Sequence, residues 1–402
     1  MLNRFANIKK LFYLGVAVAS TKLVLILFAY SFNAETYNLF NQVYYTASMV
    51  ILFGSLGFNI AVTRIKLSYK LVAVAVFANV LIAYLFLHVT STPFVNGFEI
   101  TSIILYAFFS SFGGIYVFQL LFSGRYKDYV FLTLLYSVLH LLIIPAIIYL
   151  HTDLFTVLPF VTLLWLLVGF PRYIRRQESS AKIIKEFYKV GISAFVINSA
   201  VSLALAADKY FVNHFFPLEL ANSYTFAWGI TAPMFYIGSI IEQFLFSESN
   251  TSRTNILTRG FILSTSLVIV YAVCVIFLII LFPQILPASV DYNLVLKISA
   301  LMITGYSIYV IFHFPINAYL FKSLSTSKQK TISLAFAIII SGFLALYILI
   351  FQTVISIDYI WLLILTWSYI FTLLITKIFI MFRKETDNEN ISPIMDIKNL
   401  EP

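Results

Sequence analysis

The chain has few charged residues for its length. Asp, Glu, Lys and Arg make up 11% of the 402 residues, whereas hydrophobic residues make up 61% and the mean hydropathy is +0.94. A soluble domain of this size could not bury so much apolar surface, so most of it must face lipid or other membrane helices. No charged stretch is long enough to form a separate soluble domain. The composition therefore indicates an integral membrane protein.

Several chemical signatures are also missing. The single cysteine, Cys274, lies in an apolar run, which excludes an intrachain disulfide. No G-x-x-x-x-G-K-[ST] motif is present for binding ATP phosphates, and no acid pair is spaced for catalysis. We therefore expect no enzyme activity, catalytic residue, cofactor or metal.

Apolar stretches long enough to cross a bilayer as helices fill the chain, since about 20 residues are needed. They predict an all-α membrane protein with about twelve spans, near residues 12–32, 39–62, 69–88, 99–122, 129–150, 154–173, 188–212, 220–246, 258–283, 296–320, 331–352 and 357–381.

The basic residues lie in alternate gaps between these spans. Of the 26 Lys and Arg, only Lys22, Lys209 and Lys297 lie outside the N-terminus, the gaps after even-numbered spans and the end of the last span. The intervening gaps hold acids, among them Glu35, Glu99 and Asp153. The positive-inside rule therefore predicts cytoplasmic termini. The net charge of +9 follows the topology, so we expect no nucleic-acid partner.

The longest basic gap divides the chain into two halves of six spans. We expect an N-terminal lobe at 1–173, a cytoplasmic linker at 174–187, a C-terminal lobe at 188–382 and a disordered acidic tail at 383–402. Residues 181–189 fit either a short amphipathic helix on the membrane surface or a solvated linker.

Two stretches carry a resemblance to a known family. The first comprises ETYNLFN at 35–41 and GSLGFNIAVTR at 54–64, and the second comprises ADKYFV at 207–212 and NSYTFA at 222–227. With the length, the short loops and the central linker, they resemble Wzx-type polysaccharide repeat-unit flippases of the multidrug/oligosaccharidyl-lipid/polysaccharide exporter superfamily. One departure is Glu242, where this family suggests a small or neutral residue.

The resemblance implies two six-helix lobes that form a V around a central cavity and give alternating access. It implies a multi-pass flippase of the bacterial inner membrane that carries undecaprenyl-diphosphate-linked oligosaccharide to the periplasmic leaflet, for O-antigen or capsule synthesis. Besides membrane lipid, the expected partners are the polysaccharide polymerase and chain-length proteins.

Polar residues inside the spans are the candidate cargo contacts, because a charge at bilayer depth costs at least about 2.5–3.5 kcal/mol. Lys22 lies midway along the first span and shares a face with Asn33, so its ammonium suits the cargo diphosphate. In the seventh span Asn198, Ser202 and Lys209 share a face. A lysine neutralised by neighbouring helices is the alternative for Lys22.

A second set of residues is expected to act in gating or coupling. Asp208 and Lys209 suit a gate or a sugar contact, or alternatively form an interfacial pair. His140 and His313 lie near mid-depth, and His313 aligns with Tyr306, Tyr309 and Asn317; an imidazole that changes its charge near neutral pH suits proton coupling, whereas a hydrogen-bonded packing residue is the alternative. Arg64 and Glu242 are expected near the cytoplasmic mouth, as a gate pair or as ordinary interfacial charges.

Two other functions stay open. A polysaccharide polymerase or another membrane glycan enzyme would be similarly apolar, but it would be expected to carry a substantial external loop with Arg or His. A cation-coupled small-molecule antiporter of the same superfamily would be expected to carry an acid deep in the first half, where the spans have none.

Overall fold

A computed structural model describes residues 2–65, 67–91, 94, 96–122, 125–169, 181–247, 253–323, 326–353 and 358–382. The predicted acidic tail and the first part of the predicted linker lie outside these ranges. For some helical residues, including Lys22, Arg64, Asn198 and Ser202, only the backbone is described.

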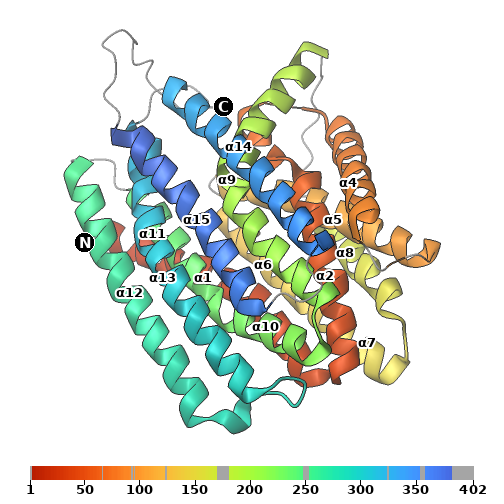
Figure 1. The fold of residues 1–402 in the computed structure, drawn as a ribbon. Helices are drawn as coiled ribbons and strands as arrows, with labels where there is room; N and C mark the ends of the chain where they lie inside the picture. Colours follow the sequence, from red (N-terminus) through yellow and green to blue (C-terminus); the bar gives the residue numbers. More distant parts are fainter. Residues whose placement is uncertain are drawn as a thin grey trace.

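The described residues fold into α-helices and one short 3-10 helix, and they contain no β-strand (Figure 1). The first half forms α1 (Leu2–Ser31), α2 (Ala34–Ser55), α3 (Phe58–Arg64), α4 (Tyr69–Ser91), α5 (Gly97–Phe122), α6 (Tyr126–Leu141), α7 (Ile143–Leu150) and α8 (Leu154–Gly169). The second half forms α9 (Ala181–Phe215), α10 (Leu218–Thr231), α11 (Pro233–Ser247), α12 (Arg253–Leu281), η2 (Pro283–Ile285), α13 (Tyr292–Ser323), α14 (Thr326–Thr353) and α15 (Tyr359–Phe382).

The surface of the bundle is apolar, as lipid contact requires. On α12, the side chains of Ile262, Val270 and Phe277 are 61%, 60% and 59% exposed. Seven stretches of the described helices are long and apolar enough to cross a membrane: Tyr69–Val89, Gly97–Leu120, Lys127–Leu150, Leu257–Leu281, Tyr292–Tyr319, Thr331–Ile350 and Tyr359–Ile380. Backbone hydrogen bonds within each helix satisfy the peptide groups that lipid cannot. The chain is therefore a multi-pass membrane protein.

Within the described residues, helices occupy most of each predicted span, although three of these spans are broken. The span at 129–150 divides at Leu142, because the ring of Pro145 would clash with the carbonyl of Leu141 in a continuous helix. The span at 220–246 divides just before Pro233 for the same kind of reason. The span at 39–62 divides at Leu56 and Gly57, which have φ angles of 38° and 68°.

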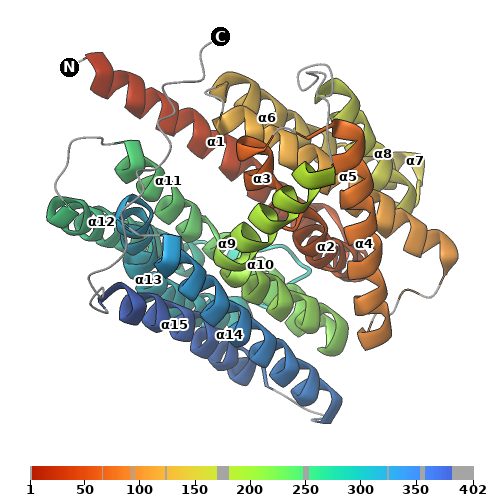
Figure 2. The same ribbon diagram turned by 90° about the horizontal axis from the view of Figure 1, so that it is seen from above.

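The helix α9 begins at Ala181, inside the segment expected as a linker. Residues 181–189 are its first turns and do not form a separate surface helix. Seen from above, α2–α8 gather on one side of the molecule and α11–α15 on the other, with α9 and α10 between them (Figure 2). We call α1–α8 the N-terminal group and α9–α15 the C-terminal group.

Candidate functional site

Of the residues predicted to act in the N-terminal group, the side chains of Asn33 and His140 are described. Asn33 is exposed and precedes α2, where its side-chain oxygen accepts a hydrogen bond from the Thr36 backbone N–H at 2.8 Å. It therefore caps the first turn of α2. Lys22 and Arg64 lie on α1 and α3, but their side chains are outside the described part of the structure.

His140 lies inside the N-terminal group, 2% exposed. Its Nδ1 is 2.8 Å from the Tyr136 carbonyl oxygen, and its Nε2 is 3.4 Å from the Tyr106 hydroxyl. One turn earlier on α6, the hydroxyls of Ser137 and Ser20 are 2.8 Å apart and join α6 to α1. The imidazole thus belongs to a hydrogen-bonded helix contact near the level of Lys22.

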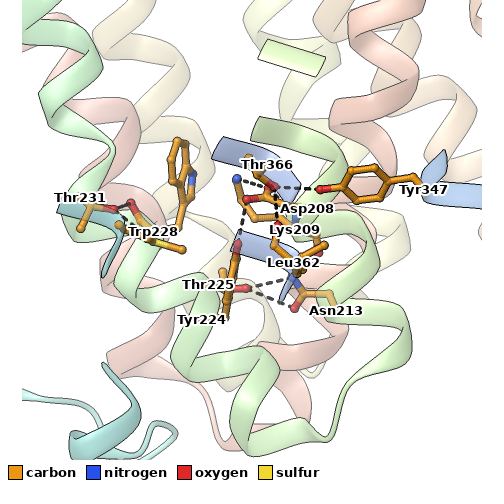
Figure 3. A network of polar contacts seen from close by, with 11 residues as sticks. Asp208, Lys209, Asn213, Tyr224, Thr225, Trp228, Thr231, Tyr347, Leu362 and Thr366 are labelled. Atoms are coloured by element: carbon orange, nitrogen blue, oxygen red, sulfur yellow. Dashed lines mark hydrogen bonds and ion pairs between the residues drawn. The ribbon is translucent and has the colours of Figure 1, made fainter. Parts of the chain in front are cut away.

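Asp208 and Lys209 form an ion pair inside the C-terminal group, and Figure 3 shows the surrounding network. The side chains are 0% and 2% exposed, and Lys209 Nζ is 2.5 Å from Asp208 Oδ1. The Tyr224 hydroxyl donates to Asp208 Oδ2 at 2.9 Å. The ammonium also lies 3.7 Å from the centre of the Trp228 ring, in cation–π contact. The two residues pair with each other, as one alternative predicted, but they are buried in protein.

The turns of α9 that follow this pair are tied to α10. Asn213 Nδ2 donates to the Lys209 carbonyl oxygen at 2.8 Å and to the Thr225 hydroxyl at 2.9 Å. On the other side of Asp208, the hydroxyls of Tyr347 and Thr366 are 2.8 Å apart and link α14 to α15. The ion pair is thus enclosed by side chains from several helices, which is how a buried pair avoids an uncompensated charge.

A second polar cluster lies toward the opposite end of the same group, between α11, α13 and α15. Lys377 is 2% exposed, donates to the Asn317 side-chain oxygen and places its Nζ 3.4 Å from His313 Nδ1. The Tyr309 hydroxyl is 2.5 Å from His313 Nδ1, and Asn317 Nδ2 is 3.2 Å from His313 Nε2. Glu242 on α11 bonds Asn317 and lies within electrostatic range of Lys377.

Lys377 is a member of this cluster that the sequence does not single out. It falls inside the predicted span 357–381, where a charge is costly, and this position is the signal that could have found it. The expected alignment of His313 with Tyr309 and Asn317 is present, because residues four apart meet on one helix face. Glu242 belongs to the same cluster. The Arg64 side chain lies outside the described part of the structure, so a gate pair between Glu242 and Arg64 stays a prediction.

The two groups of helices contact each other at the end where α9 turns into α10. Gln42 Nε2 donates to the Asn213 carbonyl oxygen at 2.8 Å, and the Thr46 hydroxyl is 3.2 Å from His214 Nε2. Two further bonds run from Asn222 Nδ2 to the Ala34 carbonyl oxygen and from the Ser289 hydroxyl to the Ala29 carbonyl oxygen, each at 3.0 Å. The contact at this end is therefore held by hydrogen bonds.

The contact at the other end of α9 is apolar and close. A Cβ atom on Gly57 would lie 2.2 Å from the Gly191 carbonyl oxygen, so the two backbones touch. Beside them, the Phe58 ring lies 4.7 Å from that of Phe187 and 5.0 Å from that of Tyr188, between ring centres. Between the two ends, Phe53 and Phe195 are 5.6 Å apart. The groups are in contact along both ends of α9 in this conformation.

Within the described residues, no group of His, Cys, Asp and Glu side chains is arranged to hold a metal ion. The chemistry available is that of buried, paired charges and aromatic rings beside an interface between two helical groups. Such an arrangement suits binding and conformational exchange. The described fold is that of a helical membrane protein with two groups of helices.

Comparisons with known proteins support the assignment of the chain to helical membrane proteins. No protein-family model matches the chain, and no curated protein matches it. Among solved structures, a MOP superfamily transporter from Pyrococcus furiosus Vc1 is 14% identical, with 93% of this chain and 96% of that one covered and a TM-score of 0.55. An outward-facing multidrug resistance MATE family transporter is 15% identical, with 93% and 95% covered and a TM-score of 0.55.

A third structure, MATE in complex with MaD5, is 14% identical, with 93% of this chain and 96% of that one covered and a TM-score of 0.53. At these identities the likeness shows the fold alone. The chain has a helical fold similar to that of the solved MATE transporters of the MOP superfamily.

Proposed function

We propose that the chain is a flippase for lipid-linked oligosaccharides. It would carry undecaprenyl-diphosphate-linked repeat units from the cytoplasmic to the periplasmic leaflet of the bacterial inner membrane, by alternating access, during O-antigen or capsule synthesis. The observation that carries this proposal is the sign of the charge within the N-terminal group. Lys22 lies well inside α1, whereas the acids of this group stand at helix starts or in gaps: Glu35, Glu99, Asp128 and Asp153.

A cation midway along a membrane helix suits an anionic cargo, because an embedded charge needs a partner of opposite sign. A diphosphate supplies that partner, and a cationic drug does not. The Pyrococcus furiosus neighbour is described as having a binding pocket of reversed polarity that suggests a different function. Pocket polarity can therefore vary within this fold, and the position of Lys22 midway along α1 favours an anionic cargo such as a diphosphate.

The proposed architecture is the one expected from the sequence: twelve crossings, two six-span lobes forming a V around a cavity, and cytoplasmic termini. It is supported by the turns between described helices. Exposed Lys70, Arg125 and Lys189 stand at the starts of α4, α6 and α9, whereas Glu35, Glu219 and Asp358 stand at the starts of α2, α10 and α15. The lobe boundaries near 173 and 188 stay part of the proposal.

In this proposal Lys22, Asn198 and Ser202 contact the cargo, together with Asn33 and Lys209 when the groups separate. Asp208, Glu242, His140, His313 and Arg64 act in gating or coupling. The buried carboxylates of Asp208 and Glu242 also favour a second candidate, a cation-coupled antiporter, because such a protein needs acids inside the membrane. The polymerase and chain-length proteins would act on the cargo after translocation.

Deletion of the gene, followed by analysis of lipid-linked sugars, tests the proposal. Loss of a flippase leaves completed repeat units facing the cytoplasm and abolishes surface polymer. Single repeat units on the cell surface would instead identify a polymerase. Full surface polymer together with lost efflux of a cationic dye would identify the antiporter.

A further inference from the structure

A direct contact between the side chains of Asp208 and Lys209 is unusual, because the two residues are adjacent on a helix. Side chains at i and i+1 on a helix point about 100° apart and do not face each other. The Lys209 chain nevertheless folds back so that its Nζ reaches Asp208 Oδ1 at 2.5 Å while lying over the Trp228 ring. The ammonium therefore lies where a carboxylate from α9 and an indole from α10 converge.

Two tyrosines complete the surroundings of the carboxylate. The Tyr224 hydroxyl donates to the second oxygen of Asp208 at 2.9 Å. The Tyr306 side chain is fully buried and its hydroxyl lies near the same carboxylate. We call Asp208, Tyr224, Trp228 and Tyr306 the ammonium box. It combines an anion with the faces and edges of aromatic rings, which are the groups that bind ammonium ions.

We propose that the ammonium box is a binding site for a primary ammonium ion, that the Lys209 side chain occupies it as a tethered ligand, and that shortening this side chain opens it to free alkylammonium ions. The consequence for the intact protein is that no external cation reaches Asp208 while the tether is in place. This inference goes beyond the proposed cargo and concerns the described conformation, in which Lys209 is buried; the cargo contact proposed for Lys209 requires the two helical groups to separate.

The ligand that fits the emptied site is the one that replaces the atoms removed by the substitution of Lys209. Lys209→Ala deletes a three-carbon chain ending in the ammonium, which corresponds to n-propylammonium. Buried cavities left by truncation bind ligands of the missing shape, because local motions admit them. A ligand that binds only the folded protein stabilises it by RT ln(1 + [L]/Kd), so the temperature of unfolding rises with the logarithm of the ligand concentration above Kd.

The experiment uses the purified full-length protein in detergent. Lys209→Ala is expected to unfold at a lower temperature than the wild type, and n-propylammonium is expected to raise that temperature logarithmically with its concentration above Kd. The wild type is expected to show no such shift. Uncharged n-propanol, of the same size, and the double variant Asp208→Asn/Lys209→Ala are expected to show none either.

The proposal is overturned if n-propylammonium shifts the unfolding temperature of folded Lys209→Ala no more than that of the wild type, or if the double variant responds equally. If Lys209→Ala accumulates only as aggregate, it is expressed with n-propylammonium in the medium, and recovery of folded protein supports the site. Failure to recover while Lys209→Met folds would also overturn it. None of these readouts involves transport, so their failure is distinct from failure of the flippase proposal.

Discussion

Gly57 and Gly191 bring the backbones of the two helical groups into direct contact. Gly57 has a φ of 68°, and a Cβ on it would meet the Gly191 carbonyl oxygen at 2.2 Å and the Phe195 backbone nitrogen at 2.6 Å. Two separate constraints thus exclude a side chain: the left-handed backbone and the close neighbour. The corner between α2 and α3 is therefore shaped to meet α9.

Gly57→Ala is expected to destabilise the protein. The left-handed conformation costs an L-residue about 1–2 kcal/mol, and the clash with α9 adds to this cost. Thermal unfolding in detergent measures the change. Gly114→Ala is the matched control, because nothing lies within 4 Å of a Cβ there and alanine favours the helix. Equal unfolding temperatures for the two variants would contradict the close contact.

The hydrogen bonds at the α9–α10 end are expected to hold that end closed. Gln42→Leu removes the donor to the Asn213 carbonyl oxygen, so the two groups should separate there more often. Spin labels on cysteines at exposed Glu35 and Leu218, in a Cys274→Ser background, report the distance across this end. We expect the population of longer distances to increase.

The control for this measurement is Thr304→Val. Its hydroxyl bonds only within its own helix in the described structure, to the Ala300 carbonyl oxygen at 2.8 Å, so no interface is affected. A distance distribution unchanged by Gln42→Leu would show that the polar contacts do not hold the end closed.

Lys377 and Glu242 are expected to be energetically coupled through Asn317. Removal of one charged partner from a buried pair typically costs about 3–5 kcal/mol, whereas removal of both costs much less. Lys377→Met and Glu242→Gln should therefore each lower the unfolding temperature, and the double variant should recover part of the loss. A double-mutant cycle on unfolding free energies measures the coupling.

The exposed pair of Glu186 and Lys189, 4.0 Å apart at the start of α9, provides the reference cycle. Its coupling should be near zero, since water screens such pairs. Strictly additive losses for Lys377→Met and Glu242→Gln would mean that the two charges do not interact.

Lys22→Gln is expected to reduce translocation of lipid-linked oligosaccharide by about tenfold or more, since a charge-assisted contact contributes about 1.5–3 kcal/mol. Membrane insertion should be unchanged. Reconstituted vesicles that report which leaflet holds the labelled lipid measure the rate, and Lys22→Arg should retain most of it. Unchanged translocation by Lys22→Gln would remove this residue from the cargo path.

The positions of the helices were predictable because apolar length alone fixes a membrane helix. Pro145 and Pro233 also mark two of the three breaks in the predicted spans, since proline removes a backbone donor. The break at Leu56 and Gly57 was not predictable in this way. It depends on a neighbour, Gly191, that lies more than a hundred residues away in the chain.

The polar clusters were predictable only in part. The alignment of His313 with Tyr309 and Asn317 follows from helix periodicity, but the partners on other helices do not. Hydropathy measures depth along one helix and gives no information on which helices surround it, so neither the burial of Lys377 nor that of Asp208 follows from the sequence. Trp228 was missed because a single tryptophan among many aromatic residues has no distinguishing local pattern.

The length of α9 has a mechanical consequence. At 35 residues it extends over about 52 Å; its third and fourth turns meet Gly57, and its last turn meets Thr46. A rigid helix held at two separate points cannot release one contact without turning about the other. Rocking of the two helical groups would therefore turn about the Gly57–Gly191 contact when the α9–α10 end opens. It would turn about the Thr46–His214 contact when the opposite end opens.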